Sequence, residues 1–186
     1  MIFCFDLDDT LYSTSELMDI VAERYALENG IPYIFDPRGY YASERYGFSN
    51  GTVFWDTHTE EVVQQVKLYS GADYFVNKCK ELGHSAIIMT HRESRLLDVT
   101  KYVLHRDGIQ FDMILCSRDI DKVDECIKLG VDYLFEDKAS TVQKAVDNRL
   151  KVFAKKHQNN WQIHGSGVVT FDDWNEVDKV IFGNGI

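Results

Sequence analysis

The sequence of 186 residues lacks features that would place it in several other protein classes. It has no apolar run long enough to span a bilayer, and Asp6, Asp8 and Asp9 interrupt its first apolar segment, so we expect neither a membrane segment nor a secretory signal. The four cysteines form no Cys-x-x-Cys pair, and Cys4 and Cys116 lie in apolar, strand-like runs. We therefore expect a cytoplasmic protein whose cysteines are reduced core residues.

Positive charge is also scarce, with 20 lysines and arginines against 30 acidic residues and a formal net charge of −10. Binding of a nucleic acid polymer needs a basic track, and the chain has none. A small phosphate can still bind if a metal, one or two lysines or a helix N-terminus supplies the attraction locally. The six histidines lack zinc-ligand spacing, and the lone Gly-Ser-Gly at 165–167 is no phosphate loop.

Short apolar runs and helical patterns alternate along most of the chain. Strands are expected at residues 2–6, up to Thr90, within 111–119, within 131–138, near 150–154 and at the start of 168–181. Helices are expected at 15–29, from about 59, at 72–82, 94–105 and 121–129, from 140, and at the end of the chain. Continuous apolar runs are typical of strands that helices cover on both faces. The pattern predicts an α/β fold, a doubly wound, three-layer parallel sheet of Rossmann type.

Oxygen-bearing side chains stand where four of these strands end. They are Asp6, Thr90, Ser117 and the pair Glu136–Asp137. In open parallel sheets, ligands bind at the carboxyl ends of the strands, near the point where the strand order reverses. The sequence therefore predicts a functional site at this edge of the sheet.

The segment FDLDDTLYS, near the start of the chain, places three carboxylates within four positions. A calcium loop would require glycine and glutamate at its sixth and twelfth positions, which hold Leu11 and Leu17, so that interpretation fails. Acids before a helix favour its dipole, which explains Asp9 and can extend to Asp8. This interaction with the helix dipole does not explain Asp6, because burying an isolated carboxylate at a strand end costs free energy without a cation or hydrogen bonds.

A site for a hard divalent cation accounts for Asp6. With Glu136 or Asp137, it would supply the oxygen ligands that Mg²⁺ prefers, and Mg²⁺ in turn bridges to a phosphate. A phosphate neutralised in this way can be attacked by a carboxylate, which gives an aspartyl-phosphate. Asp8 can then protonate the leaving oxygen and later deprotonate the attacking water. These residues predict Mg²⁺ as the cofactor and a small phosphorylated substrate.

Four segments resemble, in the expected order, the motifs of the haloacid dehalogenase (HAD) superfamily, most of whose members are phosphatases. DLDDT, which starts at Asp6, resembles the Asp-x-Asp-x-Thr signature, and IIMT ends at Thr90 like the second motif. Lys122 and the pair Glu136–Asp137 look like the third and fourth. A receiver domain also phosphorylates an aspartate, but its phosphoacceptor comes from a later strand.

The resemblance implies a role for each matching residue. Asp6 would be the nucleophile and a metal ligand. Asp8 would be the general acid/base and would place its backbone carbonyl on the metal. Thr90 would hydrogen-bond the transferring phosphoryl group, and Lys122 would balance its charge. Asp137 would hold Mg²⁺ directly or through water.

Two assignments leave alternatives open. Glu136 would support Asp137 at the metal, but Asp is the more usual residue at position 136, so either acid can be the direct ligand. Lys122 has two rivals, namely Lys128, which lies mid-helix and is expected to be solvated, and Lys138, which follows the acid pair and can neutralise it. Lys122 is preferred because it opens the helix before the fourth strand.

Residues 13–71 stand where superfamily members place a small helical cap, which leaves 1–12 and 72–186 as the core. This insert has nine acidic and four basic residues, so it is a poor clamp for nucleic acid or a polyphosphate. Its aromatic rings would either build its own core, which is favoured for any one ring, or stack on a nucleobase. They are Tyr33, Phe35, Tyr40, Tyr41, Tyr46, Phe48, Phe54 and Trp55.

Two weaker likenesses indicate a nucleotide substrate. YYASERYGFSNG resembles the cap of pyrimidine 5′-nucleotidases, and LFEDKASTVQKA, followed by NNW and VVTFDDWNEV, resembles deoxyribonucleotidase-like proteins. His91 and Arg92 are candidate substrate contacts together with Thr90 and Lys122, although Arg92 can instead pair with Glu93 on the surface.

The leading hypothesis is therefore an Mg²⁺-dependent phosphomonoesterase that acts on a small metabolite, specifically a nucleoside 5′-monophosphate. The alternatives are a catalytically silent binding protein on the same scaffold, and a phosphatase for sugar phosphates or phosphoproteins.

Overall fold

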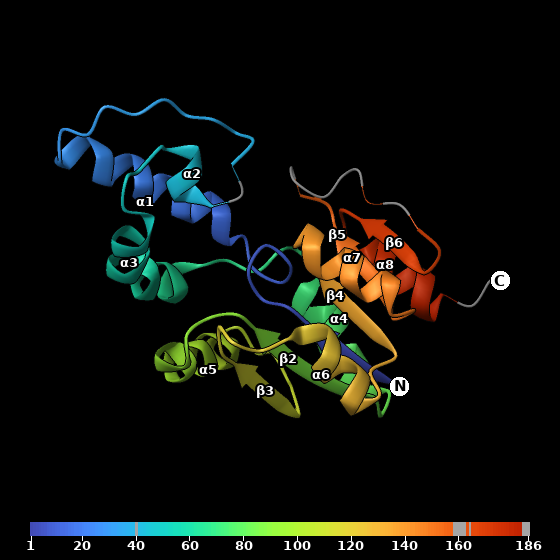
Figure 1. Cartoon of the computed structure of the whole chain (residues 1–186). Helices are drawn as coiled ribbons and strands as arrows, with labels where there is room; N and C mark the ends of the chain where they lie inside the picture. The colour runs from blue at the N-terminus through green and yellow to red at the C-terminus, as the bar shows by residue number, and fades with distance from the viewer. Residues whose placement is uncertain (40, 158–162, 164, 184–186) are drawn as a thin grey trace.

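The computed structural model describes residues 1–39, 41–157, 163 and 165–183, and its core is a six-stranded parallel sheet (Figure 1). The strands are β1 (Ile2–Phe5), β2 (Ser85–Thr90), β3 (Met113–Cys116), β4 (Tyr133–Glu136), β5 (Lys151–Lys155) and β6 (Val168–Phe171). Their spatial order is β3-β2-β1-β4-β5-β6. The chain therefore builds outward from β1 in one direction and then, starting with β4, in the other. This order confirms the predicted doubly wound α/β fold.

Helices cover both faces of the sheet (Figure 1). They are α4 (Ala72–Glu81), α5 (Leu97–Arg106), α6 (Lys122–Leu129), α7 (Ala139–Asp147) and α8 (Trp174–Phe182), with a 3₁₀ turn (Ser94–Leu96) before α5. Successive side chains of β1 point to opposite faces. Phe5 packs against Phe75 of α4 and Trp174 of α8, whereas Cys4 belongs to the apolar cluster of α6 and α7. Both faces are buried, which is why the strands read as continuous apolar runs.

Three helices between β1 and α4 form a separate group beside the carboxyl ends of the strands (Figure 1). They are α1 (Thr14–Glu28), α2 (Ala42–Arg45) and α3 (Gly51–Gln65), and we call this group the cap. Its interior is aromatic: the ring of Phe54 lies 5.3 Å from Tyr25 and 5.0 Å from Phe48, and Tyr33 lies 5.1 Å from Tyr46. These rings build the core of the cap, the alternative that the sequence favoured for any one of them.

The cap differs from the prediction at α2 and at the start of α3. The sequence pattern predicted a helix from about residue 59, but α3 begins at Gly51, and α2 was not predicted. Asn50 caps α3 because its side chain accepts a hydrogen bond from the Val53 amide at 3.2 Å. A Cβ at position 51 would lie 2.5 Å from the Ser43 side chain, so glycine there allows α3 to start against α2.

Two neighbouring chain segments join the cap to the core. Ser13 donates its amide to the Lys67 carbonyl at 2.9 Å, and Tyr69 donates to Leu11 at 2.8 Å. Arg106 of α5 also donates to the Gln64 carbonyl at the end of α3. These bonds fix the base of the cap beside the carboxyl edge of the sheet.

Two sequence-based predictions fall outside the part of the chain that the structure describes. Tyr40 is one, and the NNW stretch at 159–161 is the other. Among the described helices, none combines the length and the apolar composition needed to cross a bilayer.

Candidate active site

The point where the strand order reverses lies between β1 and β4, and it positions Asp6. The Asp6 amide donates to the Phe135 carbonyl of β4 at 3.0 Å, which continues the pairing of Phe5 with Phe135. Asp6 therefore leaves β1 beside Glu136, the last residue of β4, and Asp137, which follows it. The two strand ends that the sequence predicted to form a site are neighbours in the sheet.

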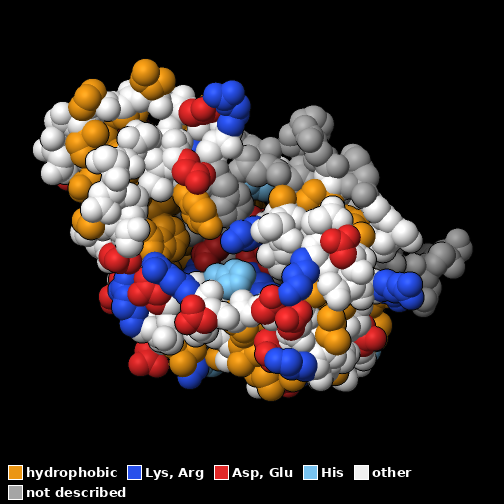
Figure 2. Space-filling model, viewed as in Figure 1, with side chains coloured by type: hydrophobic (Ala, Val, Ile, Leu, Met, Phe, Trp, Pro, Cys, Tyr) orange, Lys and Arg blue, Asp and Glu red, His pale blue; other side chains and the backbone are white. Residues whose placement is uncertain are grey.

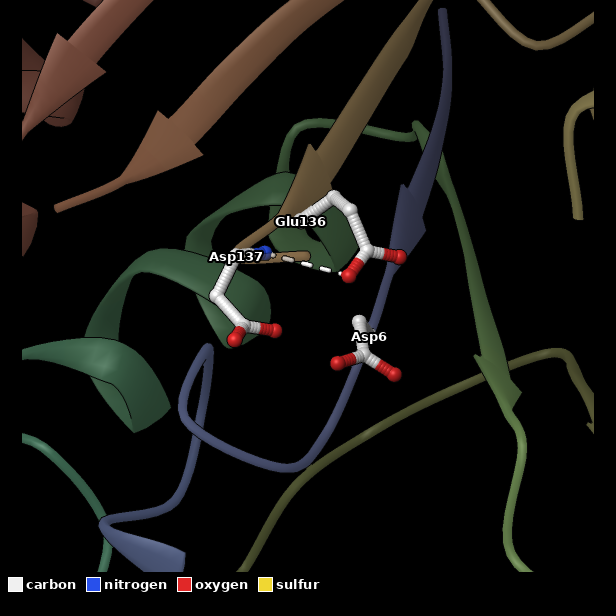
Figure 3. Close-up of side chains that lie close together, drawn as sticks. All are labelled: Asp6, Glu136 and Asp137. Atoms are coloured by element: carbon white, nitrogen blue, oxygen red, sulfur yellow. Dashed lines mark hydrogen bonds between the residues drawn. The ribbon is translucent and has the colours of Figure 1, made fainter. Parts of the chain in front are cut away.

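Three carboxylates meet at this point. Asp6, Glu136 and Asp137 each offer an oxygen within 4.8 Å of the others, and all three residues are buried. Figure 3 shows the three carboxyl groups facing a common space beyond the ends of β1 and β4. Such a cluster of buried carboxylates is stable only with cations or hydrogen-bond donors nearby.

Lys122 supplies one of these cations. Its ammonium lies 2.5 Å from Asp6 Oδ1 and 2.8 Å from Glu136 Oε2, and the residue is buried. It opens α6, where the Asp121 side chain accepts from the Asp124 amide and caps the helix. Lys128, its rival in the sequence, is exposed on the same helix beside Glu125, as expected of a solvated residue.

The four ionisable groups of the cluster perturb one another. Burial raises the pKa of Asp6 to about 7, with Lys122 opposing the rise and Glu136 adding to it. Burial, Glu136 and Asp6 raise the pKa of Asp137 well above its usual range. For Glu136, burial is outweighed by Lys122, and the pKa falls. For Lys122, burial is outweighed by the two acids, and the pKa rises.

A divalent cation fits this donor set. The cluster contains three carboxylates and one ammonium, so ionisation of all three leaves an excess of buried negative charge, which is why two of the pKa values are raised. Its ligand atoms are carboxylate oxygens, the type that Mg²⁺ prefers. The Glu136 oxygens already accept bonds from Lys122 and from the amides of Asp137 and Lys138. Of the two acids that the sequence left as alternative direct metal ligands, Glu136 is therefore the one whose two oxygens these hydrogen bonds already occupy.

Asp8 lies outside this cluster and forms an ion pair with Arg92. The Arg92 guanidinium donates to Asp8 Oδ1 at 2.7 Å and to Oδ2 at 3.0 Å, and the Thr14 hydroxyl donates to Oδ1 at 2.7 Å. Burial alone would raise the pKa of Asp8, but the Arg92 charge and these hydrogen bonds lower it. Asp6 and Asp8 thus occupy different environments, with the higher pKa on Asp6.

The position of Arg92 overturns one of its two predicted roles. The sequence left open a surface pair with Glu93, but Arg92 is buried against Asp8, and Glu93 instead pairs with Arg95 at 2.7 Å and with Arg118. Arg92 can turn inward because β2 ends at Thr90 and the chain bends there. It lines the cavity described below, so a substrate contact stays a prediction.

The other two residues at the end of β2 differ in their access to the site. Thr90 is fully buried, its hydroxyl accepts from the Arg92 amide at 3.2 Å, and it is not part of the cavity wall. His91 lines the cavity, and a ring nitrogen lies 2.9 Å from the Ile120 carbonyl. Ser117, which follows β3, only caps a turn by accepting from the Asp119 amide. The phosphoryl contact predicted for Thr90 stays a prediction.

A cavity of about 580 Å³ lies between the cap and the carboxyl edge of the sheet. Figure 2 shows this hollow, with acidic side chains at its floor and basic and histidine side chains around it. Asp6, Asp8 and Lys122 belong to its floor, and Phe54 and Trp55 line it from the cap. The volume suits a small organic ligand that reaches the carboxylates.

The structure shows what the remaining polar residues of the first segment do, including Asp9, which the sequence assigned to the start of the helix. Asp9 has a positive φ of 58° and accepts from the Ser15 amide at 2.8 Å, so it caps the first turn of α1. The Thr10 hydroxyl donates to Asp137 at 3.5 Å. Thr10 and Thr14 both lie in or beside the Asp-x-Asp-x-Thr segment, a signal that could have identified them.

Solved structures share this architecture over nearly the whole chain. A predicted phosphatase from Clostridium acetobutylicum is 19% identical with a TM-score of 0.70, and the match covers 98% of each chain. A predicted phosphoglycolate phosphatase from Haemophilus somnus 129pt is 14% identical, with a TM-score of 0.68 and 96% of each chain covered. A HAD family hydrolase from Deinococcus radiodurans R1, solved with bound phosphate and sodium, is 13% identical, with a TM-score of 0.68 over 97% of this chain and 94% of that one.

At identities of 13 to 19%, these likenesses establish a common fold, that of HAD family hydrolases. No protein-family model matches the sequence, and no curated protein matches it.

Proposed function

We propose that this protein is an Mg²⁺-dependent phosphomonoesterase that forms an aspartyl-phosphate on Asp6. One observation carries the proposal: Asp6 sits within a buried group of three carboxylates and one lysine, at the floor of a cavity. Structural ion pairs seldom place surplus carboxylates in a cavity floor, because each uncompensated charge is costly there. Phosphoryl transfer is catalysed mainly by positioning and charge stabilisation, which a cation held by carboxylates and a nearby lysine can supply.

In the proposed reaction an Asp6 oxygen attacks phosphorus, and the bond between phosphorus and the ester oxygen breaks. Asp8, which has first taken up a proton from solvent, gives that proton to the leaving oxygen. A water molecule then attacks phosphorus, Asp8 takes a proton from it, and the Asp6 carboxylate leaves. Lys122, at 2.5 Å from Asp6, balances the charge of the transferring group. Ester and water are consumed, and alcohol and phosphate are formed.

The metal would be held by Asp6, Asp137 and the backbone carbonyl of Asp8, with Glu136 in support. When bound, Mg²⁺ would neutralise part of the phosphate charge, so that a carboxylate can approach it. The hydrogen bonds that Glu136 accepts from Lys122 and Lys138 favour Asp137 as the direct ligand.

Asp8 has to exchange partners during the reaction. Its carboxylate is held in the ionised form by Arg92 and Thr14. To carry a proton it must give up the Arg92 bond at 2.7 Å and turn to the leaving oxygen. Arg92 would then be left with a positive charge at the cavity wall, where a substrate anion can take the place of Asp8.

We propose a sugar phosphate or phosphoglycolate rather than a nucleotide as the substrate. Most of the cap rings that could stack on a nucleobase pack on one another, which removes the main support for a nucleotide. One structural neighbour is described as a predicted phosphoglycolate phosphatase. The sequence named sugar phosphates as an alternative to nucleotides, and the structural neighbours favour that alternative.

The test is phosphate release from an aryl phosphate, with Mg²⁺ and with EDTA. We expect turnover only with Mg²⁺, and a loss of at least ~10⁴-fold in Asp6→Asn because the nucleophile is removed. Asp73→Asn is the matched control, since Asp73 is an exposed acid on α4. Equal activity of Asp6→Asn and Asp73→Asn would refute the nucleophile, and an inactive wild type would favour the catalytically silent alternative.

A further inference from the structure

Lys138 is a cavity-lining cation that the proposed mechanism does not use. Five lysines and arginines line the cavity, and four of them are within 3.5 Å of a carboxylate: Arg45 with Asp19 (2.8 Å), Arg92 with Asp8 (2.7 Å), Arg118 with Asp56 (3.4 Å) and Lys122 with Asp6 (2.5 Å). For Lys138, no carboxylate in the described part of the chain lies within ion-pair distance of the ammonium. The predicted alternative, in which Lys138 neutralises the acid pair, is therefore not what the structure shows.

The main chain at Lys138 is fixed by the carboxylate cluster. The residue directly follows Asp137 and precedes α7, and its amide donates to Glu136 Oε1 at 2.9 Å. Its side chain is half-buried in the cavity wall. A flexible four-carbon stem lets the ammonium move toward an anion in the cavity while the backbone stays in place.

Lys138 is separate from the position of the transferring phosphoryl group. Asp6 marks that position, and the ammonium in contact with Asp6 belongs to Lys122. No described hydrogen bond or ion pair joins the Lys138 ammonium to Asp6 or to Glu136. The cavity therefore has two lysines with different surroundings, one neutralised by the catalytic acids and one facing the ligand space.

Because the molecule is negatively charged, this second lysine would distinguish substrates with a second anionic group from substrates without one. The chain has a formal net charge of −10, and the cavity floor is acidic, so a substrate with a second anionic group is repelled unless a cation receives that group. An ammonium without a carboxylate partner gains most from such a group, since it gives up no existing ion pair.

We propose that Lys138 binds a second anionic group, a carboxylate or a phosphate, of a small phosphomonoester. This inference rests on the proposed function. Lys138 is then a specificity-determining residue that favours substrates with two separate anionic groups over neutral alkyl or aryl phosphates.

The test compares matched substrate pairs in the wild type and in Lys138→Gln. Phosphoglycolate and ethyl phosphate differ by a carboxylate in place of a methyl group, and propane-1,3-diol bisphosphate and propyl phosphate differ by a phosphate. We expect the ratio of kcat/KM within at least one pair to fall by ~10- to 100-fold in Lys138→Gln, the effect of losing one charge-assisted hydrogen bond. The pair that responds identifies the second group. Lys128→Gln, on the exposed face of α6, should leave both ratios unchanged.

Two results would overturn the inference. An equal fall for all four compounds would mean that Lys138 acts on the transferring phosphoryl group. Unchanged ratios in both pairs would mean that it contacts no second group.

A binding measurement separates this inference from the proposed function. Calorimetry with the same four compounds and Mg²⁺, in the Asp6→Asn variant with and without Lys138→Gln, reports the affinity ratios without turnover. If these ratios fall while the wild type hydrolyses none of the compounds, the role of Lys138 stands and the phosphatase proposal fails. If they do not change, the role of Lys138 fails whether or not the wild type is an enzyme.

Discussion

Asp6 and Asp8 stand two positions apart in the chain, yet their carboxylates have opposite electrostatic environments. Asp6 is buried beside Glu136, which raises its pKa to about 7, whereas Arg92 holds the pKa of Asp8 low. The roles predicted from the sequence require an ionised Asp6 and an Asp8 that can carry a proton, whereas without a metal the pKa of Asp6 is raised and that of Asp8 is lowered. The sequence could not show which partner each would have, since Arg92 follows β2 and Lys122 opens α6, and both lie more than 80 residues away in the chain.

Replacement of Lys122 by methionine tests the balance of charge at the nucleophile. Removing the ammonium leaves Asp6 and Glu136 buried without their shared partner, so we expect the free energy of unfolding to fall by about 3–5 kcal/mol in EDTA. Turnover should fall by ~10²- to 10³-fold, the usual loss when one charge-stabilising group is removed. Chemical denaturation and steady-state kinetics measure the two effects.

Lys128→Met is the control for this substitution, because Lys128 lies exposed on the same helix. Its free energy of unfolding should change by less than ~0.5 kcal/mol. Equal stability of the two variants would show that Lys122 does not compensate the buried acids.

At the scale of helices and strands, hydrophobic periodicity was sufficient for the core and insufficient for the cap. Every predicted core strand is present, because each is an apolar run, mostly buried in β1, β2, β4 and β5 and partly exposed in the edge strands β3 and β6, and the acids that follow β1 and β4 mark their ends. In the cap, α2 has only four residues, and the start of α3 depends on the contact of Gly51 with Ser43. Contacts of this kind do not show in the local hydrophobic pattern, and so the helix predicted from about residue 59 in fact begins at Gly51.

Gly51→Ala tests this contact. The new Cβ would lie 2.5 Å from the Ser43 side chain, so we expect a loss of about 1–3 kcal/mol in the free energy of unfolding from overpacking between α2 and α3. Because Gly51 also lines the cavity, KM should rise. Thermal unfolding and steady-state kinetics provide the readouts.

A second substitution shows whether the clash is the cause. Ser43→Gly removes the atoms that the new Cβ meets, so the double variant should regain part of the stability lost in Gly51→Ala, beyond the sum of the single effects. Additive losses would contradict the proposed contact.

The molecule as a whole has a net negative charge, and a cluster of three buried carboxylates lies where the cation is proposed to bind. The net charge of −10 excluded a polyanionic partner from the sequence alone, and it required local attraction for any phosphate. At the carboxyl edge the structure places one cation, Lys122, and a carboxylate cluster that could hold the divalent cation needed for such attraction. The substrate could not be predicted in the same way, because several cap rings that could have stacked on a nucleobase pack on one another instead.

The dependence of stability on pH and Mg²⁺ follows from the raised pKa values. Without metal, folded Asp6, with a pKa of about 7, keeps a proton that the unfolded chain releases, so its contribution to stability falls as pH rises from about 4 to about 7. The raised pKa of Asp137 acts in the same direction. Mg²⁺ binds the deprotonated carboxylates, and its stabilising effect should therefore grow over the same range. At ~100 times the dissociation constant it would reach about 2.7 kcal/mol.

Thermal unfolding with Mg²⁺ and with EDTA, from about pH 5 to about pH 8, measures this effect. The unfolding midpoint with Mg²⁺ should exceed the midpoint with EDTA by an amount that grows with pH in the wild type. In Asp137→Asn this difference should be smaller. A difference that is constant with pH, or unaffected by Asp137→Asn, would contradict a metal site at the carboxylate cluster.

The most direct test of the account is to identify the phosphorylated residue. Protein mixed with Mg²⁺ and a substrate would be quenched during turnover and reduced with borohydride, which converts an aspartyl-phosphate to homoserine. The account predicts homoserine at position 6 in the peptide analysed by mass spectrometry, and none when Mg²⁺ is replaced by EDTA. Active enzyme with unmodified Asp6, or with the modification at Asp8 or Asp137, would contradict it.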